Sequence, residues 1–435
     1  MPDPSREPLH ALSATALAEG LRDGVFTAEA VAQSCLARIT AREPAVQAWA
    51  WLDAEGVLAQ ARAADHRLAA GLPLGALHGI PVGIKDIIDT ADMPTENGTV
   101  LHAGRRPAAD AALITRLRKA GAIIVGKTVT TELATYAPGK TRNPHNSEHT
   151  PGGSSSGSAA AVAAGMVPLA VGTQTNGSAI RPAAFCGVYG YKPTAGLISQ
   201  AGVLRQSPAL DQVGVFARTV DDAALLAAQL IESSLDLGSA ADTAMPPRLA
   251  FVRTPRWEDT TDDTRAAYAR LIERLGGSVT EVTMPAAAAP AWDWHRTVME
   301  TEIAENFDAE WQNGKARLSA SLRGQIERGR VTAVADYQHA LAQIPLVDAL
   351  FDDLYSKYDV ILTPSVAGTA PRGLGSTGDP AFCTLWTFCG MPAINVPLLH
   401  GANGLPLGVQ LVGPRRGDVR VLRAARWLTL LQQIF

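Results

Sequence analysis

The chain has 435 residues and a formal net charge of −4, and 47% of its residues are hydrophobic while 18% are charged. This composition is typical of a globular protein with a sizeable core and unlike that of a disordered chain. The charge balance leaves no basic surface for phosphate groups, so we do not expect direct binding of nucleic acid.

Four cysteines are scattered along the chain: Cys35, Cys186, Cys383 and Cys389. They form no C-x-x-C pairs, which argues against a disulfide framework and against a structural zinc site. The first residues contain no charged segment followed by an apolar one, so we expect no secretory signal. The longest apolar stretch, 159–171, is shorter than the ~20 residues of a membrane span, and we interpret it as a buried helix leading into a strand. We therefore expect a cytoplasmic protein that does not enter the membrane.

The N-terminal part, 1–70, is predicted to be helical. Apolar residues recur at helical spacing from Leu12 to Arg42, with Thr27 as an N-cap, and a further helix is expected over 54–70. The sequence pattern changes at 79–90, where β-branched residues between glycines predict a strand.

Strands and helices then alternate up to about residue 225. The pattern predicts a helix at 110–120, a strand at 122–125, a loop at 138–157, a helix at 158–165, a strand at 167–171 and a loop at 172–178.

The second half continues with a strand–helix–strand unit at 248–283 and an almost wholly helical region at 286–350. Three tryptophans of this region, Trp292, Trp294 and Trp311, could border a pocket, although aromatic residues at helical spacing more often belong to a core. A final strand at 359–363 precedes a loop at 364–380. No linker or repeat divides the chain, so 1–435 is interpreted as one large α/β domain with helical additions.

Three segments combine small residues with one reactive side chain. They are GIKD with Lys85, the serine run PGGSSSGS at 151–158, and GTQTNGSAIRP at 172–182 with Ser178. Acyl transfer needs a nucleophile, a base, and preorganised N–H groups for the negative charge that develops on the carbonyl oxygen. Thr175, Asn176 and Gly177 would offer such N–H groups just before Ser178.

Each segment is ambiguous when taken alone. Lys85 could be an ordinary ion-paired lysine, and the serine run lacks the G-K-[ST] ending of a phosphate-binding loop. Residues 153–157 formally match G-x-S-x-G, but the residues before them cannot form the strand that a nucleophile elbow requires. His295, His339 and His400 lie in no conspicuous motif, and the carboxylates show no metal-binding spacing.

Together, the segments resemble the amidase signature family. The resemblance runs from GIPVGIKD at 79–86 through 152–165 and 172–194, and resumes at YDVILTP at 358–364, at GMPAINVP and at GLPLGVQLVG. It implies an α/β fold with a large mixed sheet of about eleven strands, flanked by helices on both faces. The signature core would span 79–225, and 286–350 would be a variable helical region near the substrate pocket.

The resemblance also implies a Ser–cis-Ser–Lys triad. Carried over by position, Ser178 is the nucleophile, Ser154 after a cis Gly153–Ser154 bond is the proton relay, and Lys85 is the base. The oxyanion hole would be formed by Thr175, Asn176, Gly177 and Ser178. A lysine accepts a proton only when neutral, so burial should depress the pKa of Lys85, while Asp86, next along the strand, should point to the opposite face.

The chain departs from the family pattern in the nucleophile turn. Many members have an acidic residue and a second glycine there, whereas this chain has Gln174 and Asn176. Arg181 lies three residues after Ser178 and could clamp a substrate carboxylate. It could equally pair with a structural carboxylate.

The leading hypothesis is a stand-alone, metal-independent and cofactor-free hydrolase of small-molecule amides, with carbamates (urethanes), anilides or esters as related substrates. The nearest alternative is the glutamine-hydrolysing A subunit of a tRNA-dependent amidotransferase. The TQTNGS turn and the short stretch after GVQLVG favour the stand-alone enzyme. An inactive binding or scaffold homologue is a second alternative, and a homodimer is one option for the oligomeric state.

Overall fold

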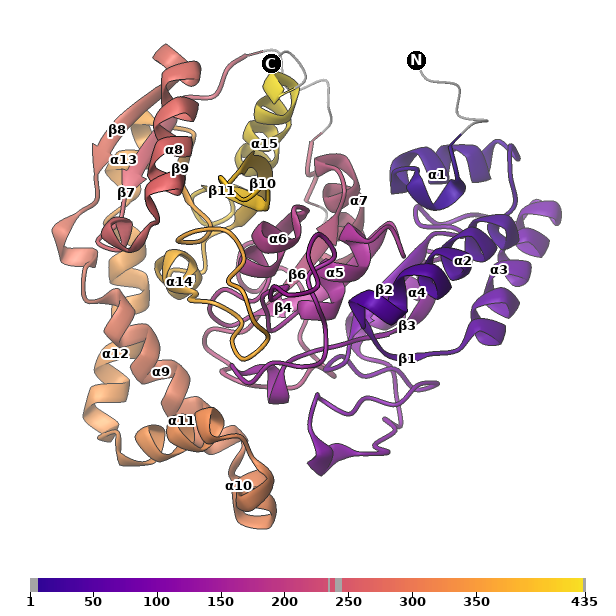
Figure 1. The fold of residues 1–435 in the computed structure, drawn as a ribbon, viewed down its shortest axis with the longest axis horizontal. Coiled ribbons are helices and arrows are strands. Elements are labelled where there is room, and N and C mark those ends of the chain that lie inside the picture. Colours follow the sequence, from indigo (N-terminus) through magenta and orange to yellow (C-terminus); the bar gives the residue numbers. More distant parts are fainter. Residues whose placement is uncertain (1–6, 234, 239–244, 433–435) are drawn as a thin grey trace.

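The centre of the protein is a mixed β-sheet that runs through the whole molecule (Figure 1). The computed structural model describes residues 7–233, 235–238 and 245–432. Within them, eleven strands follow the order β1-β3-β2-β4-β6-β5-β10-β11-β9-β7-β8. The strands are β1 (Trp49–Leu52), β2 (Pro81–Lys85), β3 (Ile123–Thr128), β4 (Leu169–Gln174), β5 (Tyr189–Lys192), β6 (Gln212–Ala217), β7 (Leu249–Arg253), β8 (Val279–Thr283), β9 (Val360–Pro364), β10 (Ala393–His400) and β11 (Pro406–Val412).

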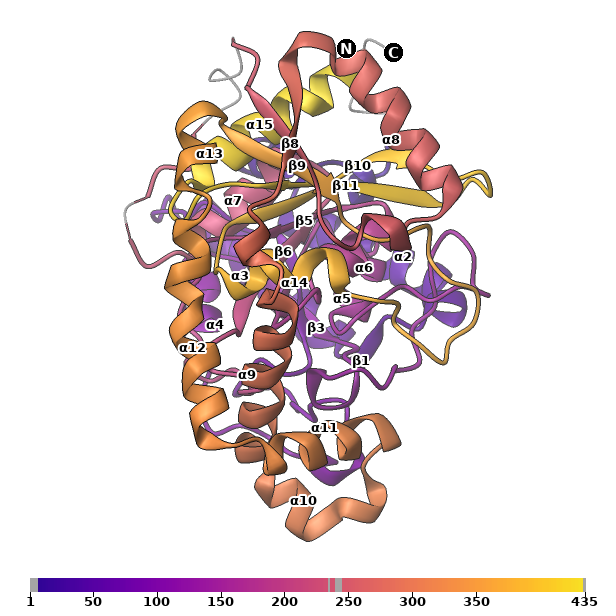
Figure 2. The ribbon, with the colours of Figure 1, turned by 90° about the vertical axis from the view of Figure 1, so that its left-hand side faces the viewer.

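Helices cover the sheet, and four of them extend from it as an arm (Figures 1 and 2). The arm consists of α9 (Ala291–Asn306), α10 (Asp308–Gly314), α11 (Ala320–Val331) and α12 (Val334–Ala349). The other α-helices are α1 (Ala14–Arg22), α2 (Ala28–Val46), α3 (Ala54–Ala69), α4 (Ala112–Lys119), α5 (Ser156–Ala163), α6 (Ile180–Cys186), α7 (Val220–Leu230), α8 (Asp262–Leu275), α13 (Asp352–Lys357), α14 (Ala381–Phe388) and α15 (Asp418–Gln432).

The eleven-stranded mixed sheet with helices on both faces confirms the fold class expected from the sequence. The predicted helices of the first 70 residues are present, and the Thr27 hydroxyl accepts a hydrogen bond from the N–H of Ala30 as an N-cap. The unit at 248–283 forms β7, α8 and β8, and 286–350 is almost entirely helical. The apolar stretch 159–171 is buried and spans the end of α5 and the start of β4.

Other sequence-based boundaries were wrong. The strand expected over 79–90 is only β2, because a turn follows Lys85. The strand at 359–363 is not the last one, since β10 and β11 follow it, and β1, β5 and β6 were not anticipated. β5, β6, β10 and β11 contain glycine, proline or buried polar residues, which obscure the alternation of apolar and polar residues on which strand prediction depends. β1 contains none of these residues and is only four residues long.

Two parallel pairings place the future site in the interior of the sheet. β2 pairs with β3 on one side and with β4 on the other, and all residues of the three strands are buried. Parallel strands begin and end at the same edges of a sheet, so the segments that follow β2 and β4 emerge side by side.

The tryptophans of the arm serve mainly in packing. Trp292 donates its indole N–H to the carbonyl of Ala381, and the Trp294 ring stacks on Phe388 at 6.5 Å between centroids. Trp311 lies under the charged ends of Lys315 and Arg330. The arm is thereby anchored to α14 near the middle of the molecule.

The last helix is tied to the sheet by Asp418, which is fully buried. Its carboxylate accepts from the Tyr191 hydroxyl at 2.6 Å, from the Thr194 N–H at 2.9 Å and from the Thr194 hydroxyl at 2.6 Å. We expect Asp418→Ala to lower the free energy of unfolding by about 3 kcal/mol, because three buried donors lose a charged acceptor. Urea denaturation measures this change. The exposed Glu273→Ala on α8 is the control and should change it by less than about 0.5 kcal/mol.

Candidate active site

Lys85 ends β2 in the interior of the sheet, and its side chain has no exposed surface. Its Nζ donates to the Ser154 hydroxyl at 2.7 Å and to the Thr173 hydroxyl at 2.8 Å. Burial lowers the pKa of Lys85 to about 7, and the more distant charge of Asp211 opposes the shift. The amine is therefore available in its neutral form near neutral pH.

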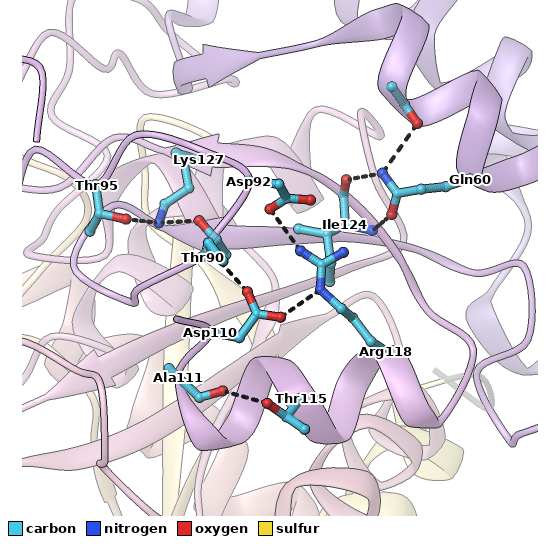
Figure 3. Close-up of polar contacts among 12 residues, drawn as sticks. Gln60, Thr90, Asp92, Thr95, Asp110, Ala111, Thr115, Arg118, Ile124 and Lys127 are labelled. Atoms are coloured by element: carbon cyan, nitrogen blue, oxygen red, sulfur yellow. Dashed lines mark hydrogen bonds and ion pairs between the residues drawn. The ribbon is translucent and has the colours of Figure 1, made fainter. Parts of the chain in front are cut away.

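Asp86 does not act on Lys85, in agreement with its expected orientation. Its carboxylate accepts from the N–H of Glu96 at 3.2 Å, and the charge that it faces is that of Lys127. Burial raises the pKa of Asp86 and lowers the pKa of Lys127, and the attraction between the two groups opposes both shifts. Figure 3 shows Lys127 between the hydroxyls of Thr90 and Thr95. This second buried lysine is thus engaged in a separate cluster.

The serine run divides its hydroxyls between two tasks. Ser155, Ser156 and Ser158 each donate to a backbone carbonyl, namely those of Thr173, Val129 and Val171. Ser154 instead lies against Lys85, is almost completely buried, and follows a cis peptide bond from Gly153. No strand leads into this run, so the nucleophile-elbow interpretation has no structural support.

Ser178 lies in the short turn between the end of β4 at Gln174 and the start of α6 at Ile180. The N–H of Ser155 donates to the carbonyl of Ser178 at 3.4 Å, so the serine run and this turn lie against each other. Ser178 is 8% exposed, compared with 1% for Ser154. Of the two serines, Ser178 is therefore the more accessible to a ligand.

In the backbone of residues 175–178, the carbonyl groups and the N–H groups differ in whether they form hydrogen bonds. All four carbonyls accept hydrogen bonds, whose donors are His295 Nε2, the Thr387 hydroxyl, Arg181 N and Ser155 N in chain order. None of the four N–H groups donates to any other residue that the structure describes. Buried N–H groups without partners are rare in folded proteins, and a row of them can bind a negatively charged oxygen.

Gln174 contributes to this arrangement. Its Oε1 accepts from the N–H groups of Ala179 and Ile180 at 2.9 and 3.0 Å, and its Nε2 donates to the Thr387 hydroxyl at 2.9 Å. The amide thus takes over the N–H groups that follow the turn, as an acidic residue could. Unlike a carboxylate, it also donates a hydrogen bond to the Thr387 hydroxyl.

The side chains of the turn are also fixed. The Thr175 hydroxyl donates to Asp211 at 2.5 Å. Asn176 donates to the Tyr136 hydroxyl at 3.2 Å and accepts from Thr384 at 2.8 Å. The departure from glycine at position 176 therefore adds two anchors to the turn.

Arg181 points to neighbouring loops. Its guanidinium donates to the carbonyls of Gly153 and Gly378 at 2.7 and 3.0 Å and to the Thr377 hydroxyl at 3.1 Å. Its Nε has no partner among the described residues, and no carboxylate forms an ion pair with it there. Burial lowers the pKa of Arg181. The loop at 364–380 is thus held against the serine run.

Several residues around the turn were not identified from the sequence. Thr173, His295, Thr384 and Thr387 reach it from β4, α9 and α14. His295 had been seen only as a histidine outside any motif. The one available signal concerns Thr173, because it lies near the end of β4, the strand that pairs in parallel with the strand ending at Lys85. The other three come from segments far away in the sequence.

Within the described ranges, no group of three or more His, Cys, Asp or Glu side chains could hold a metal ion. No helix there is long and apolar enough to cross a membrane. All four cysteines are buried and unpaired with one another.

The chain is similar to known proteins over most of its length. The family model Amidase matches residues 30–422. The A subunit of a glutamyl-tRNA(Gln) amidotransferase from Chloroflexus aggregans is 33% identical, with 95% of each chain covered. A solved amidase superposes with a TM-score of 0.88 at 29% identity, covering 97% of this chain and 100% of the other. The peptide amidase of Stenotrophomonas maltophilia superposes with a TM-score of 0.83 at 26% identity, covering 98% of both chains. The chain therefore belongs to the amidase family, whose members hydrolyse C–N bonds.

Proposed function

We propose that this protein is a stand-alone amidase that hydrolyses small-molecule amides through an acyl-enzyme on Ser178. The observation that carries the proposal is the buried, readily neutral Lys85 bonded to Ser154, next to a turn whose four N–H groups have no partner among the described residues. Base, relay, nucleophile and oxyanion donors are the parts that acyl transfer requires.

In the proposed first step, neutral Lys85 takes the proton of the Ser154 hydroxyl while Ser154 takes the proton of Ser178. The Ser178 oxygen attacks the substrate carbonyl carbon, and the N–H groups of residues 175–178 stabilise the resulting oxyanion. The proton then returns from Lys85 through Ser154 to the leaving nitrogen, and the C–N bond breaks. Water releases the acyl group by the same relay, which leaves all three residues in their starting states.

The A subunit of a tRNA-dependent amidotransferase is the second candidate. It is favoured by the 33% identity to such a subunit over 95% of each chain. In that case glutamine would be the substrate and the ammonia would pass to a partner protein. The similarity in fold to a solved amidase and to a solved peptide amidase supports the stand-alone enzyme equally well.

A substrate panel separates these candidates. The purified chain is assayed alone with aryl and alkyl amides, matched carbamates and esters, and free glutamine. Turnover of simple amides by the chain alone is expected. Activity restricted to glutamine, or appearing only after a partner is added, would contradict the stand-alone assignment. Absence of turnover together with absence of labelling by a serine-directed phosphonate would support the inactive homologue.

Ser178→Ala is expected to reduce amide turnover to background and to abolish labelling by a phosphonate, because the other hydroxyl of the turn, that of Thr175, is engaged with Asp211. Ser155→Ala is the matched control, since its hydroxyl is bonded to the Thr173 backbone, and it should keep the label. The labelled residue is identified by peptide mass spectrometry. A label that stays on another serine of the Ser178→Ala variant would show that the nucleophile has been assigned wrongly.

The pH dependence of kcat/KM follows from the pKa of Lys85, which is lowered to about 7. Below this pH the amine is protonated and cannot accept a proton, so kcat/KM should fall about tenfold per pH unit and level off above it. Replacing Lys85 by Ala should also remove the acid limb.

The same variant should lose more amide than ester hydrolysis. An amine leaving group needs the returned proton, whereas the alkoxide or phenoxide of an activated ester can depart without it. Amides and esters with the same acyl group are compared. Lys127→Met, at another buried lysine, is the control and should keep the wild-type ratio. If Lys85→Ala hydrolyses amides as well as the wild type, Lys85 is not the base.

Two roles are proposed for Arg181: it binds the carboxylate of one class of substrate, or it holds the loop at 364–380 in place. Arg181→Lys distinguishes these two roles. If it clamps a substrate carboxylate, kcat/KM should fall by at least about tenfold for carboxylate-bearing amides only. If it holds the loop through Gly153 and Gly378, neutral and anionic amides should lose activity equally. Paired neutral and anionic substrates with the same scissile bond provide the measurement.

A further inference from the structure

Two peptide units of the nucleophile turn are held from behind by residues of distant helices. His295, on α9, contacts the Thr175 carbonyl at 2.9 Å through Nε2. Thr387, on α14, donates its hydroxyl to the Asn176 carbonyl at 2.5 Å. Both residues are 1% exposed, so no solvent competes for these carbonyls.

A peptide unit is planar and trans, so its C=O and its N–H point in opposite directions. The carbonyl of Thr175 shares a plane with the N–H of Asn176, and the carbonyl of Asn176 shares one with the N–H of Gly177. A donor that fixes either carbonyl therefore also sets the direction of an N–H group on the other side. These two N–H groups belong to the row that has no partner in the described structure.

The protonation of the two donors is defined by their neighbours. A carbonyl oxygen can only accept, so Nε2 of His295 carries a proton, and burial keeps the imidazole neutral by lowering its pKa to about 4. The Thr387 oxygen accepts from the Gln174 amide at 2.9 Å, which leaves its single proton for the Asn176 carbonyl at 2.5 Å or, at 3.0 Å, for the carbonyl of Cys383. The shorter distance favours Asn176.

We propose that His295 and Thr387 are positioning residues of the oxyanion hole, which orient the N–H groups of Asn176 and Gly177 by holding the carbonyls at the opposite ends of their peptide units. This inference rests on the proposed function, since it concerns the same turn. Neither residue touches the substrate. Their contribution is to transition-state stabilisation, because oxyanion donors act only when correctly oriented before charge develops.

Two pairs of variants test the proposal. His295→Leu and Thr387→Val remove the donors with little change in volume, whereas His295→Gln and Thr387→Ser keep an N–H or O–H donor. Ile303→Val, at a buried position of α9 on the same helix as His295, is the control for lost packing. For each variant we would measure kcat and KM on one amide, the inhibition constant of a trifluoromethyl ketone with the same acyl group, and the melting temperature.

His295→Leu and Thr387→Val should each lower kcat about 10- to 100-fold with KM changed less than about threefold. The trifluoromethyl ketone, which forms a tetrahedral oxyanion on the nucleophile, should bind more weakly by the same factor as kcat/KM. The Gln and Ser variants should recover to within about threefold of the wild type. The control should keep its kcat even where its melting temperature falls.

If the Leu and Val variants melt earlier but keep the wild-type kcat, the two residues are structural and the inference is wrong. If only one of the two variants folds, its kcat and inhibition constant are sufficient to test the inference. Both residues act on adjacent peptide units of the same turn. Failure of the proposed function gives a different result, since Ser178→Ala would then retain the wild-type activity. A Ser178→Ala variant without activity, combined with full kcat in the Leu and Val variants, overturns this inference alone.

Discussion

The site depends on the burial of Lys85 next to groups that carry no charge. Both acceptors of its Nζ are hydroxyls, those of Ser154 and Thr173, and the charge that opposes the lowering of its pKa is that of Asp211, which forms no ion pair with it. An ammonium group in this position loses its hydration and gains no contacting carboxylate in return. The interior of the sheet, where β2 lies between β3 and β4, provides this environment. An edge strand would leave the amine hydrated and charged.

A second constraint is the distribution of hydrogen bonds in the turn formed by residues 175–178. The four carbonyls accept hydrogen bonds from α6, α9, α14 and the serine run, whereas the four N–H groups find no partner in the described part of the chain. A loop alone rarely keeps all its carbonyls bonded and all its N–H groups unbonded, since its own N–H and C=O groups would pair with each other. The turn instead lies between helices that contact each other, because α9 packs on α14 through Trp292 and Trp294. The helical arm, which was expected only to border the substrate pocket, is thus bonded to the turn itself.

The sequence predicted the fold class and the residues that the structure brings together, because these lie in short motifs rich in glycine. Gly153 and Gly177 show why those motifs are recognisable: a Cβ on either would come within 3 Å of another side chain. The strands β5, β6, β10 and β11 were not predicted, since buried polar residues such as Gln212, Asn395 and Gln410 interrupt their apolar pattern. His295 and Thr387 could not have been assigned either. Their roles depend on tertiary contacts across more than a hundred residues, and nothing in their local sequence distinguishes them from core residues.

The strand order has a consequence for the order in which the site is assembled. The six strands from β1 to β6 all come from residues 49–217 and form one half of the sheet, while the five from β7 to β11 form the other, joined to the first through β5 and β10. Lys85, Ser154 and Ser178 belong to the first half, and His295 and Thr387 to the second. A ribosome releases the N-terminal half first. The nascent chain therefore carries Ser178 before the helices that bond to the carbonyls of its turn exist, and the complete turn forms only when the second half has been synthesised and has docked.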